Sequence, residues 1–271
     1  MTEYQLNVAH LYGNLMNTYG DYGNIIALTY YAKQTGVAVD YQLVSLGDEF
    51  DDQAFDFVLF GGGQDYEETI VAEDLPAKAT AIKHYIENDG PLLAVCGGFQ
   101  LLGHYMVMAD GTRVDGIGVM DHYTTNMYDD QLTVLSGKRL TGNIVIENND
   151  TGEKYHGFEN HQGRTFLGEG ERALGTVISG NGNNGMDKTE GVIYRNVYGS
   201  YFHGPIFTRN GNLAKRVLAT ALQRKYPDVD WQARLDAVPT ESFYYKNCGK
   251  LMMISLPQFL FLLRCGRFRV L

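Results

Sequence analysis

Several features that define common protein classes are scarce or absent in this chain of 271 residues. Its three cysteines, Cys96, Cys248 and Cys265, stand at scattered positions, which fits neither a disulfide framework nor a zinc site and indicates reduced thiols. No apolar run reaches the roughly 20 residues that a membrane-spanning helix needs. The N-terminal sequence lacks the basic and then apolar layout of a signal peptide, so we expect a cytoplasmic protein.

Basic side chains are also in the minority. The chain has 22 Lys and Arg residues against 32 Asp and Glu residues, which gives a formal net charge of −10. Nucleic-acid-binding proteins usually carry a basic stripe, so we expect no nucleic-acid partner. The phosphate-loop pattern G-x-x-x-x-G-K-[ST] does not occur; if the overall reaction needs ATP, another chain must bind it. Hydrophobic residues make up 44 % of the sequence, which is ample for a packed core.

The composition changes abruptly near the C-terminus. From Thr240 onward five basic residues and one acid give +4, which leaves −14 for residues 1–239. The apolar segment LMMISLPQFLFLL is too short to span a membrane and contains Pro257. We expect residues 1–235 to form the functional domain. We interpret residues 236–271 as a poorly ordered extension or an artificially added sequence; the alternative is a peptide that docks on a partner or a membrane surface.

The first half of the domain alternates between strand-like and helix-like segments. Apolar runs at residues 5–12 and 55–63 predict strands, and residues 21–36 show helical spacing of apolar positions. Residues 76–88 begin with proline and continue as a helix, and residues 91–105 run from an apolar strand into another helix. This alternation predicts an α/β fold, with a central, mostly parallel sheet and helices on both faces.

The positions of two glycine-rich segments indicate where a ligand binds. Ligands of parallel sheets bind beyond the carboxyl ends of the strands, and both Gly61–Gly63 and Cys96–Gly98 fall at such ends. The second half, at about 112–208, favours strands joined by polar turns, and residues 210–226 predict a final helix. Residues 180–185, GNGNNG, match the dinucleotide pattern, but no helix is expected after them, so we interpret them as a loop.

Cys96 is the strongest candidate for a nucleophile. It lies between an apolar strand and a Gly97-Gly98 helix start, where glycines permit a sharp turn. A lone cysteine in a strand is usually a small apolar core residue, and the context favours the functional interpretation. We expect the helix N-terminus to lower the pKa of the thiol and the Gly97 amide to face a developing oxyanion. A second oxyanion donor is expected from the glycine run at 61–63.

A thiolate mechanism also needs a histidine that takes and returns protons. His84 and His104 read as helical and are more typical of surface or packing residues. His203 ends a predicted strand before Gly-Pro, whereas His161 lies in a loop-like segment. Spacing alone favours His203 over His161 without excluding the latter. The seven histidines are His10, His84, His104, His122, His156, His161 and His203.

Five ordered segments together resemble the class I (triad-type) glutamine amidotransferases, whose fold is a flavodoxin-like three-layer sandwich. Within them the chain is most similar to the cobyric acid synthase-like branch, and in particular to the glutaminase subunits of lipid II isoglutaminyl synthases in Gram-positive bacteria. The resemblance covers roughly residues 5–225 and excludes the tail. The segments are FGGGQDYEE, LAVCGGFQLLG, KRLTGNIVIEN, GFENHQGRT and YGSYFHGPI.

The resemblance implies a role for each residue at the site. Cys96 attacks the side-chain amide of L-glutamine, and His203 protonates the leaving ammonia and then activates water. The amides of Gly63 and Gly97 hold the oxyanion. The resemblance also implies that Arg139 binds the substrate, and an arginine fork suits an α-carboxylate. Further residues expected to bind the substrate or line the site are Gln100, Gly62, Asn160 and His161.

The resemblance also implies a partner. Free ammonia is protonated in water, so its release is useful only beside an acceptor site. The partner is a Mur ligase-like synthetase, forming a heterodimer, which uses ATP and Mg to activate the D-glutamate α-carboxyl of lipid II and yields D-isoglutamine for peptidoglycan and cell shape. No cofactor or metal is expected in this chain. Lipid II would bring the complex near the inner face of the membrane.

One departure from the family pattern concerns the acid that orients the histidine. Other class I amidotransferases place it two residues after the histidine, where this chain has Pro205. We hypothesise that a carboxylate from elsewhere in the fold, or from the partner, takes its place. Two alternative functions stay open: a γ-glutamyl cysteine hydrolase or peptidase of the same fold, and a non-catalytic regulatory module.

Overall fold

A computed structural model describes residues 4–108, 110–126 and 138–240, together with three short strands further along the chain. Contacts divide the chain into two units, residues 1–241 and 242–271. The second unit contains an antiparallel sheet of β16 (Met252–Leu256), β17 (Phe259–Arg264) and β18 (Arg267–Phe268). Cys248 and Cys265 lie outside the described residues. The predicted boundary at residue 235 falls one residue before the end of α7 (Trp231–Asp236).

The first unit is organised around a six-stranded sheet with the order β13-β14-β4-β3-β1-β2. Five of its strands are parallel and the edge strand β13 is antiparallel, which confirms the mostly parallel sheet expected from the sequence. Its central strands β3 and β4 are buried along their whole length, as their continuous apolar runs predict. The strands are β1 (Tyr4–Leu11), β2 (Val37–Val44), β3 (Phe57–Phe60), β4 (Leu92–Val95), β13 (Val192–Tyr194) and β14 (Val197–Ser200).

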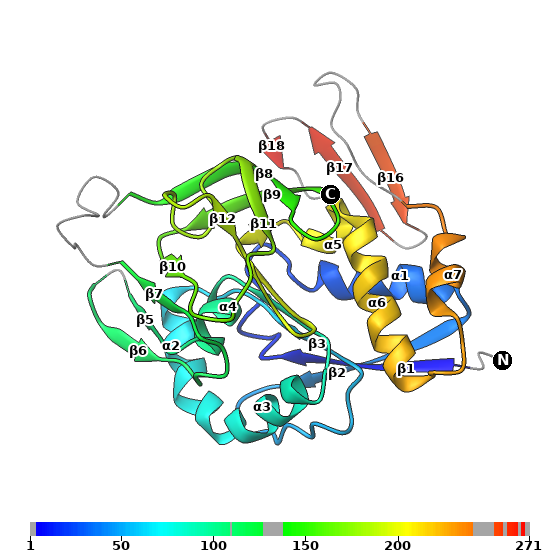
Figure 1. Ribbon diagram of the computed structural model, residues 1–271, viewed down its shortest axis with the longest axis horizontal. Helices are drawn as coiled ribbons and strands as arrows, with labels where there is room; N and C mark the ends of the chain where they lie inside the picture. Colours follow the sequence, from blue (N-terminus) through cyan, green and yellow to red (C-terminus); the bar gives the residue numbers. More distant parts are fainter. Residues whose placement is uncertain are drawn as a thin grey trace. The chain divides into compact units, whose positions relative to one another are not determined.

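Helices separate into two groups around this sheet (Figure 1). α1 packs against α5 and α6, and α6 against α7, whereas α2 and α3 lie on the other side of β1 and β3 in that view. α6 buries Leu213, Val217 and Ala221 on one face, as its spacing predicts. The remaining helices are α1 (Gly23–Gln34), α2 (Asp65–Asp74), the 3₁₀ helix η1 (Leu75–Ala77), α3 (Ala79–Glu87), α4 (Gly97–Leu102), α5 (Ile206–Arg209) and α6 (Gly211–Lys225).

Two smaller sheets complete the unit. One has the order β10-β7-β5-β6, with β5 (Tyr105–Val107), β6 (Arg113–Asp115), β7 (Tyr123–Thr125) and β10 (Arg164–Phe166). The other has the order β12-β11-β8-β9-β15, with β8 (Leu140–Asn148), β9 (Lys154–His161), β11 (Gly175–Ser179), β12 (Thr189–Glu190) and β15 (Phe202–His203). Only Tyr201 separates β14 from β15, so the chain passes directly from the six-stranded sheet into the five-stranded one.

This crossing brings two distant parts of the sequence together. β14 pairs with β4 so that Ser200 lies opposite Val95, and the amide of Cys96 donates to the carbonyl of Ser200 at 2.9 Å. His203 follows three residues later, at the end of β15. The sheet register therefore places the predicted nucleophile and the predicted histidine at the same end of neighbouring strands.

Two local predictions are wrong, and one helix was not predicted. His161 is the last residue of β9 rather than part of a loop, because its segment pairs with β8 along the whole strand. His104 lies beyond the end of α4 and its ring contacts Asp121 at 2.8 Å. Residues 65–74 form α2, which the sequence analysis did not predict. The loop interpretation of residues 180–185 is confirmed, since no helix follows them.

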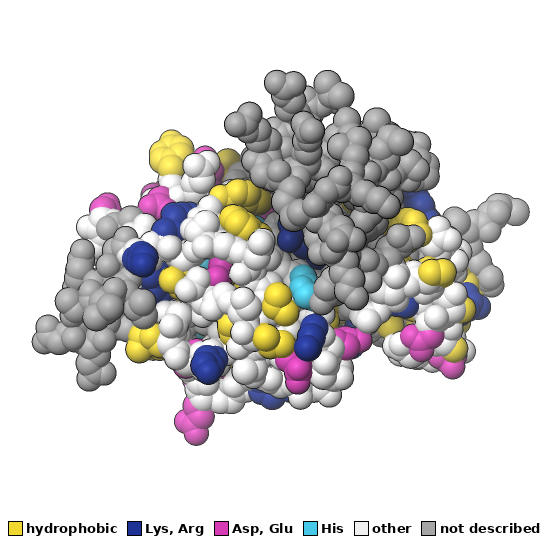
Figure 2. All heavy atoms as spheres, turned by 90° about the horizontal axis from the view of Figure 1, so that it is seen from above, with side chains coloured by type: hydrophobic (Ala, Val, Ile, Leu, Met, Phe, Trp, Pro, Cys, Tyr) yellow, Lys and Arg dark blue, Asp and Glu magenta, His cyan; other side chains and the backbone are white. Residues whose placement is uncertain are grey.

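On the face drawn in Figure 2, acidic and basic side chains of the described residues are interspersed rather than gathered into a block of one sign. This distribution gives no support to a nucleic-acid interface on that face. No helix within the described parts of the chain is both long enough and apolar enough to cross a membrane.

Candidate active site

Cys96 occupies a strained turn between β4 and α4. Its φ of +48° and ψ of −109° lie in a region that side-chain-bearing residues rarely adopt, and such strain is typical of functional positions. The turn is packed against the glycine run: the Gly98 amide donates to the Gly61 carbonyl at 3.1 Å. A Cβ on Gly98 would lie 2.4 Å from the Phe60 carbonyl oxygen, so only glycine fits there.

Gly62 lies beside both Cys96 and His203. A Cβ on this residue would lie 3.0 Å from Cys96 Cβ and 3.4 Å from His203 Cε1, so the two side chains flank the same glycine. The Gly62 amide donates to the Asp21 carboxylate at 2.7 Å, and its carbonyl accepts from the Thr18 amide at 2.9 Å. Both backbone polar groups of Gly62 thus have partners, and its expected contact with the substrate stays a prediction.

The pKa of the Cys96 thiol is raised, contrary to the lowered value that the helix N-terminus suggested. Burial is the main cause, and the carboxyls of Glu68 and Asp21 raise the pKa further; the Gly97 amide and Arg139 lower it only in part. Burial also raises the pKa of Glu68 to about 8 and that of Asp21 to about 7. Since α4 has only six residues, its dipole does not overcome desolvation. The thiol therefore needs a nearby base.

His203 has the properties of that base. Burial, followed by the charge of Arg139, lowers the pKa of its imidazole to about 4, so the ring is neutral at neutral pH and accepts a proton. No described residue forms a hydrogen bond with either ring nitrogen. The Tyr19 ring lies over it, with 4.7 Å between ring centroids. The source of an orienting acid stays a hypothesis.

The two predicted oxyanion amides differ in their surroundings. The Gly97 amide faces the Cys96 sulfur and lowers the pKa of the thiol, as a donor beside the reacting carbon must. The Gly63 amide hydrogen-bonds the Glu68 carboxylate and lowers its pKa. Glu68 also packs on Gly97, where a Cβ would lie 2.1 Å from its Oε1. In this structure only the Gly97 amide is directed at the thiol.

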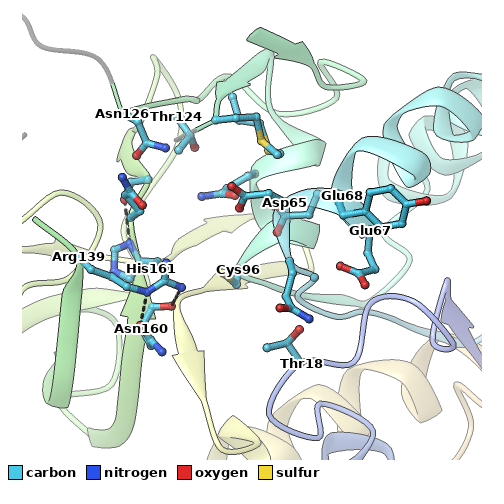
Figure 3. Close-up of a pocket in the computed structure, with 18 of the residues that line it drawn as sticks. Thr18, Asp65, Glu67, Glu68, Cys96, Thr124, Asn126, Arg139, Asn160 and His161 are labelled. Carbon is cyan, nitrogen blue, oxygen red and sulfur yellow. Dashed lines mark hydrogen bonds between the residues drawn. The ribbon is translucent and has the colours of Figure 1, made fainter. Parts of the chain in front are cut away.

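A cleft of about 510 Å³ opens above the thiol. Figure 3 shows Cys96 between two walls: Arg139, Asn160 and His161 come from the β8–β9 side, and Asp65, Glu67 and Glu68 come from α2. The Arg139 guanidinium thus faces a wall of carboxyl groups, an arrangement that suits the two charged groups of an amino acid. Further residues on the cleft are Thr18, Tyr19, Gly63, Gln64, Tyr66, Gln100, Met106, Val107, Met108, Thr124, Asn126, Gln162, Gly163 and His203.

The polar side of the cleft is held by hydrogen bonds. Gln100 donates from Nε2 to the Tyr201 hydroxyl at 2.9 Å. His161 stacks on the Tyr201 ring at 3.6 Å, and its Nδ1 lies 2.8 Å from the Gly163 carbonyl oxygen, which fixes the proton on Nδ1. Burial lowers the pKa of His161 to about 3, so this ring stays neutral. Arg139 donates from Nε to the side-chain oxygen of Asn160.

Sequence reasoning missed three residues of the site. Glu68 follows the glycine run in DYEE, an acidic segment whose helical spacing would have indicated α2. Asp21 and Tyr19 lie between β1 and α1, and no motif singles them out. Within the described residues, no group of three or more His, Cys, Asp or Glu side chains is placed to hold a metal ion.

The chain is similar to known glutamine amidotransferases. Residues 7–211 match the CobB/CobQ-like glutamine amidotransferase domain. A curated relative, "Lipid II isoglutaminyl synthase (glutamine-hydrolyzing) subunit GatD" of Streptococcus pneumoniae, is 55 % identical over 239 residues, which cover 88 % of this chain and 89 % of the relative. The protein of the same name from Staphylococcus aureus is 38 % identical, with 82 % and 86 % covered.

The chain also has more distant similarities. Cobyric acid synthase of Listeria welshimeri is 28 % identical over 64 % of this chain and 33 % of that protein. A solved structure described as a glutamine amidotransferase has 18 % sequence identity and a TM-score of 0.50, covers 79 % of this chain and 98 % of that chain, and so indicates the fold alone. The chain belongs to the family of CobB/CobQ-like glutamine amidotransferase domains.

Proposed function

We propose that this chain is the glutaminase subunit of a lipid II isoglutaminyl synthase. It hydrolyses L-glutamine through a thioester on Cys96 and passes ammonia to a Mur ligase-like synthetase. The observation that carries the chemistry is that Cys96 and His203 flank Gly62 in one cleft. The names of the relatives at 55 % and 38 % identity support the choice of acceptor.

The first half of the reaction forms the thioester. The thiol proton moves to the neutral His203 imidazole while the sulfur attacks the carboxamide carbon, and the carbonyl oxygen becomes an oxyanion. The Gly97 amide donates to this oxygen; the Gly63 amide is the second donor once the Glu68 carboxylate moves aside. The carbon–nitrogen bond then breaks, and His203 returns the proton to the leaving nitrogen, which departs as ammonia.

The second half releases glutamate. His203 takes a proton from water, the resulting hydroxide attacks the thioester carbon, and the carbon–sulfur bond breaks. The imidazolium then reprotonates the sulfur, so the enzyme is regenerated. Arg139 holds the α-carboxylate of the substrate throughout, because its planar fork matches a carboxylate, while Gln100 lines the same wall.

The partner uses the ammonia. In this proposal a Mur ligase-like synthetase holds ATP and Mg, activates the α-carboxyl of the D-glutamate in lipid II, and receives ammonia before it is protonated in water. The product is D-isoglutamine in the peptidoglycan precursor. The heterodimer works in the cytoplasm, next to the membrane that carries lipid II, and this chain itself needs no cofactor.

The direct test measures ammonia and glutamate released from glutamine, by the chain alone and with the co-expressed synthetase. We expect wild type with its partner to release both in equal amounts and Cys96→Ala to release neither. Release of product from γ-glutamyl peptides but not from free glutamine would instead identify a peptidase. If neither substrate reacts and Cys96→Ala behaves like wild type, the chain is a non-catalytic module.

A further inference from the structure

Asn160 lies at the centre of a hydrogen-bonded bridge in the cleft. It belongs to β9, where it pairs in register with Thr141 of β8. Its side-chain oxygen accepts from Arg139 Nε and from the Thr141 hydroxyl at 3.0 Å, and its amide nitrogen donates to the Tyr19 hydroxyl. Arg139 also donates to the Asn160 backbone carbonyl at 3.3 Å. Figure 3 shows Asn160 and Arg139 joined on one wall.

The identity of these partners fixes the orientation of the amide. Two donors meet the side-chain oxygen, and the nitrogen meets a hydroxyl that accepts, so a flipped amide would face Arg139 with a donor. Leucine, of similar size, offers no such pair of functions. The residue type asparagine is therefore matched to its three neighbours.

Tyr19 connects this bridge to His203. Its ring centroid lies 4.7 Å from that of His203, and its φ of +60° is a conformation that persists only where surrounding contacts hold it. The side chain is 50 % exposed, so packing alone does not hold it. Tyr19 precedes α1, whereas Asn160 belongs to the five-stranded sheet. The bridge thus joins two separate parts of the fold beside the imidazole.

We propose that Asn160 is a positioning residue that couples recognition of the substrate to the orientation of His203. One end of its amide fixes the Arg139 guanidinium, and the other end holds the Tyr19 ring over the imidazole. The proposal rests on the proposed function, because it takes Arg139 as the binder of the substrate α-carboxylate and His203 as the base. Asn160 thus acts both on the binding of the substrate and on the position of the base.

The surroundings of His203 make the Tyr19 contact important. Charged or titratable groups near the ring are Arg139, His161 and Cys96, and no described residue forms a hydrogen bond with its nitrogens. The Tyr19 ring, tilted by 52° to the imidazole, covers it at 4.7 Å between ring centroids, and His203 is 1 % exposed. If the Tyr19 ring moves away, the imidazole gains water, and its pKa rises toward the ordinary value of 6.5.

The arginine half of the proposal is tested by the rate at which two reagents label Cys96 in the full chain. The diazoketone analogue of glutamine carries the α-carboxylate, whereas iodoacetamide does not. We expect Asn160→Leu to slow labelling by the analogue about tenfold, equivalent to one lost hydrogen bond to a charged group, and labelling by iodoacetamide less than about threefold. Thr141→Val, which removes another bond to the same oxygen, is the matched control and should change neither rate by more than about twofold.

The tyrosine half is tested by titrating the His203 imidazole in the full chain by NMR. Tyr19→Ala and Asn160→Leu should both raise its midpoint from about 4 toward 6.5, and Thr141→Val should leave it unchanged. Tyr19→Phe keeps the ring but loses the Asn160 bond, so it should give a smaller shift in the same direction. Asn160→Ala repeats both measurements if the leucine variant does not fold.

The outcomes separate this inference from the proposed function. Equal slowing of both reagents in Asn160→Leu, or an unchanged His203 midpoint in Asn160→Leu and Tyr19→Ala, would overturn the positioning role. The function fails separately if free glutamine does not protect wild-type Cys96 from the analogue. Slower labelling by the analogue alone, together with a raised His203 midpoint, supports the coupling. A residue with only a structural role would change the labelling rates of both reagents alike.

Discussion

The two walls of the cleft hold their charges in opposite ways. On the β8–β9 wall, Arg139 is fixed by hydrogen bonds to Asn160, and the neighbouring His161 is kept neutral by burial. On the α2 wall, the carboxyl of Glu68 is buried without an ion pair to a described basic residue, and its pKa rises to about 8. One wall is thus organised before a substrate arrives, whereas the other must change its charge or its position.

The difference suggests that the two walls have different roles in the reaction. In the proposed reaction the ordered wall recognises the α-carboxylate of glutamine. Ionised carboxylates near Cys96 raise the pKa of its thiol, so the acidic wall opposes formation of the thiolate. Between the walls, the ends of β4 and β15 carry the reacting groups. The reaction therefore depends most on the sheet ends, then on the recognition wall, and least on the acidic wall.

The largest effect is expected for His203→Asn, which removes the group between the walls. Without a base, the buried thiol is not deprotonated, and we expect kcat for glutamine to fall by about 10³-fold or more, measured as ammonia release by the assembled complex. In wild type the acid limb of kcat/KM should lie near pH 4 rather than 6.5, because burial lowers the pKa of His203 and only the neutral ring is active. His84→Asn is the control, because His84 is exposed and does not line the cleft. Wild-type rates in His203→Asn would mean that another group is the base.

The next largest effect is expected for Gly62→Ala, which tests the spacing between Cys96 and His203. The new methyl group would lie 3.0 Å from Cys96 Cβ and 3.4 Å from His203 Cε1, so both neighbours must give by a few tenths of an ångström. Because a displacement of about 1 Å costs on the order of 10²-fold in rate, these smaller shifts should lower kcat by more than about tenfold and less than about 10²-fold. Thermal unfolding checks that the fold is intact. An unchanged kcat would show that the pair does not act across this glycine.

A smaller effect is expected for Arg139→Lys, which perturbs the recognition wall. Lysine keeps the charge but loses the planar fork and the bonds to Asn160, so KM for glutamine should rise about tenfold with little change in kcat. Arg172→Lys is a matched control, because Arg172 forms an exposed ion pair with Asp150. A fall in kcat with KM unchanged would assign Arg139 to the chemical step instead.

The smallest effect is expected for Glu68→Gln, which removes the charge of the acidic wall. Above its pKa of about 8 the Glu68 carboxyl is ionised, and loss of this charge lowers the pKa of the Cys96 thiol. Alkylation by iodoacetamide at about pH 9 should therefore become faster by up to about tenfold, the factor that one pKa unit gives. Glu73→Gln makes the same change on an exposed position of α2 and should have no effect. Slower alkylation in Glu68→Gln would show that its charge does not oppose the thiolate.

The sequence predicted the sheet and the residues at its ends because these follow from short-range patterns. Apolar strand runs, helical spacing and glycines at the strand ends locate Cys96 and the 61–63 run without any knowledge of tertiary structure. Spacing favoured His203 over His161, and the resemblance implied its role as the base. The register that places Ser200 opposite Val95 was not predicted, because it depends on pairing between distant strands.

The rest depends on contacts between segments that are far apart in the sequence. The raised pKa of Cys96 results from burial and from Glu68 and Asp21, neither of which belongs to a recognisable motif. His161 was assigned to a loop because its strand is recognised only through pairing with β8. Likewise, the link from Tyr19 to Asn160 joins residues 141 positions apart, which no local pattern encodes.

The central statement is that Cys96 carries the acyl group of glutamine during turnover. Rapid acid quenching of the complex with glutamine, followed by peptide mass spectrometry, measures this directly. The account predicts a glutamyl thioester on the peptide that contains Cys96, which accumulates with glutamine and is absent from Cys96→Ala. Ammonia release without any acyl group on that peptide, or an acyl group on Cys248 or Cys265 instead, would contradict it.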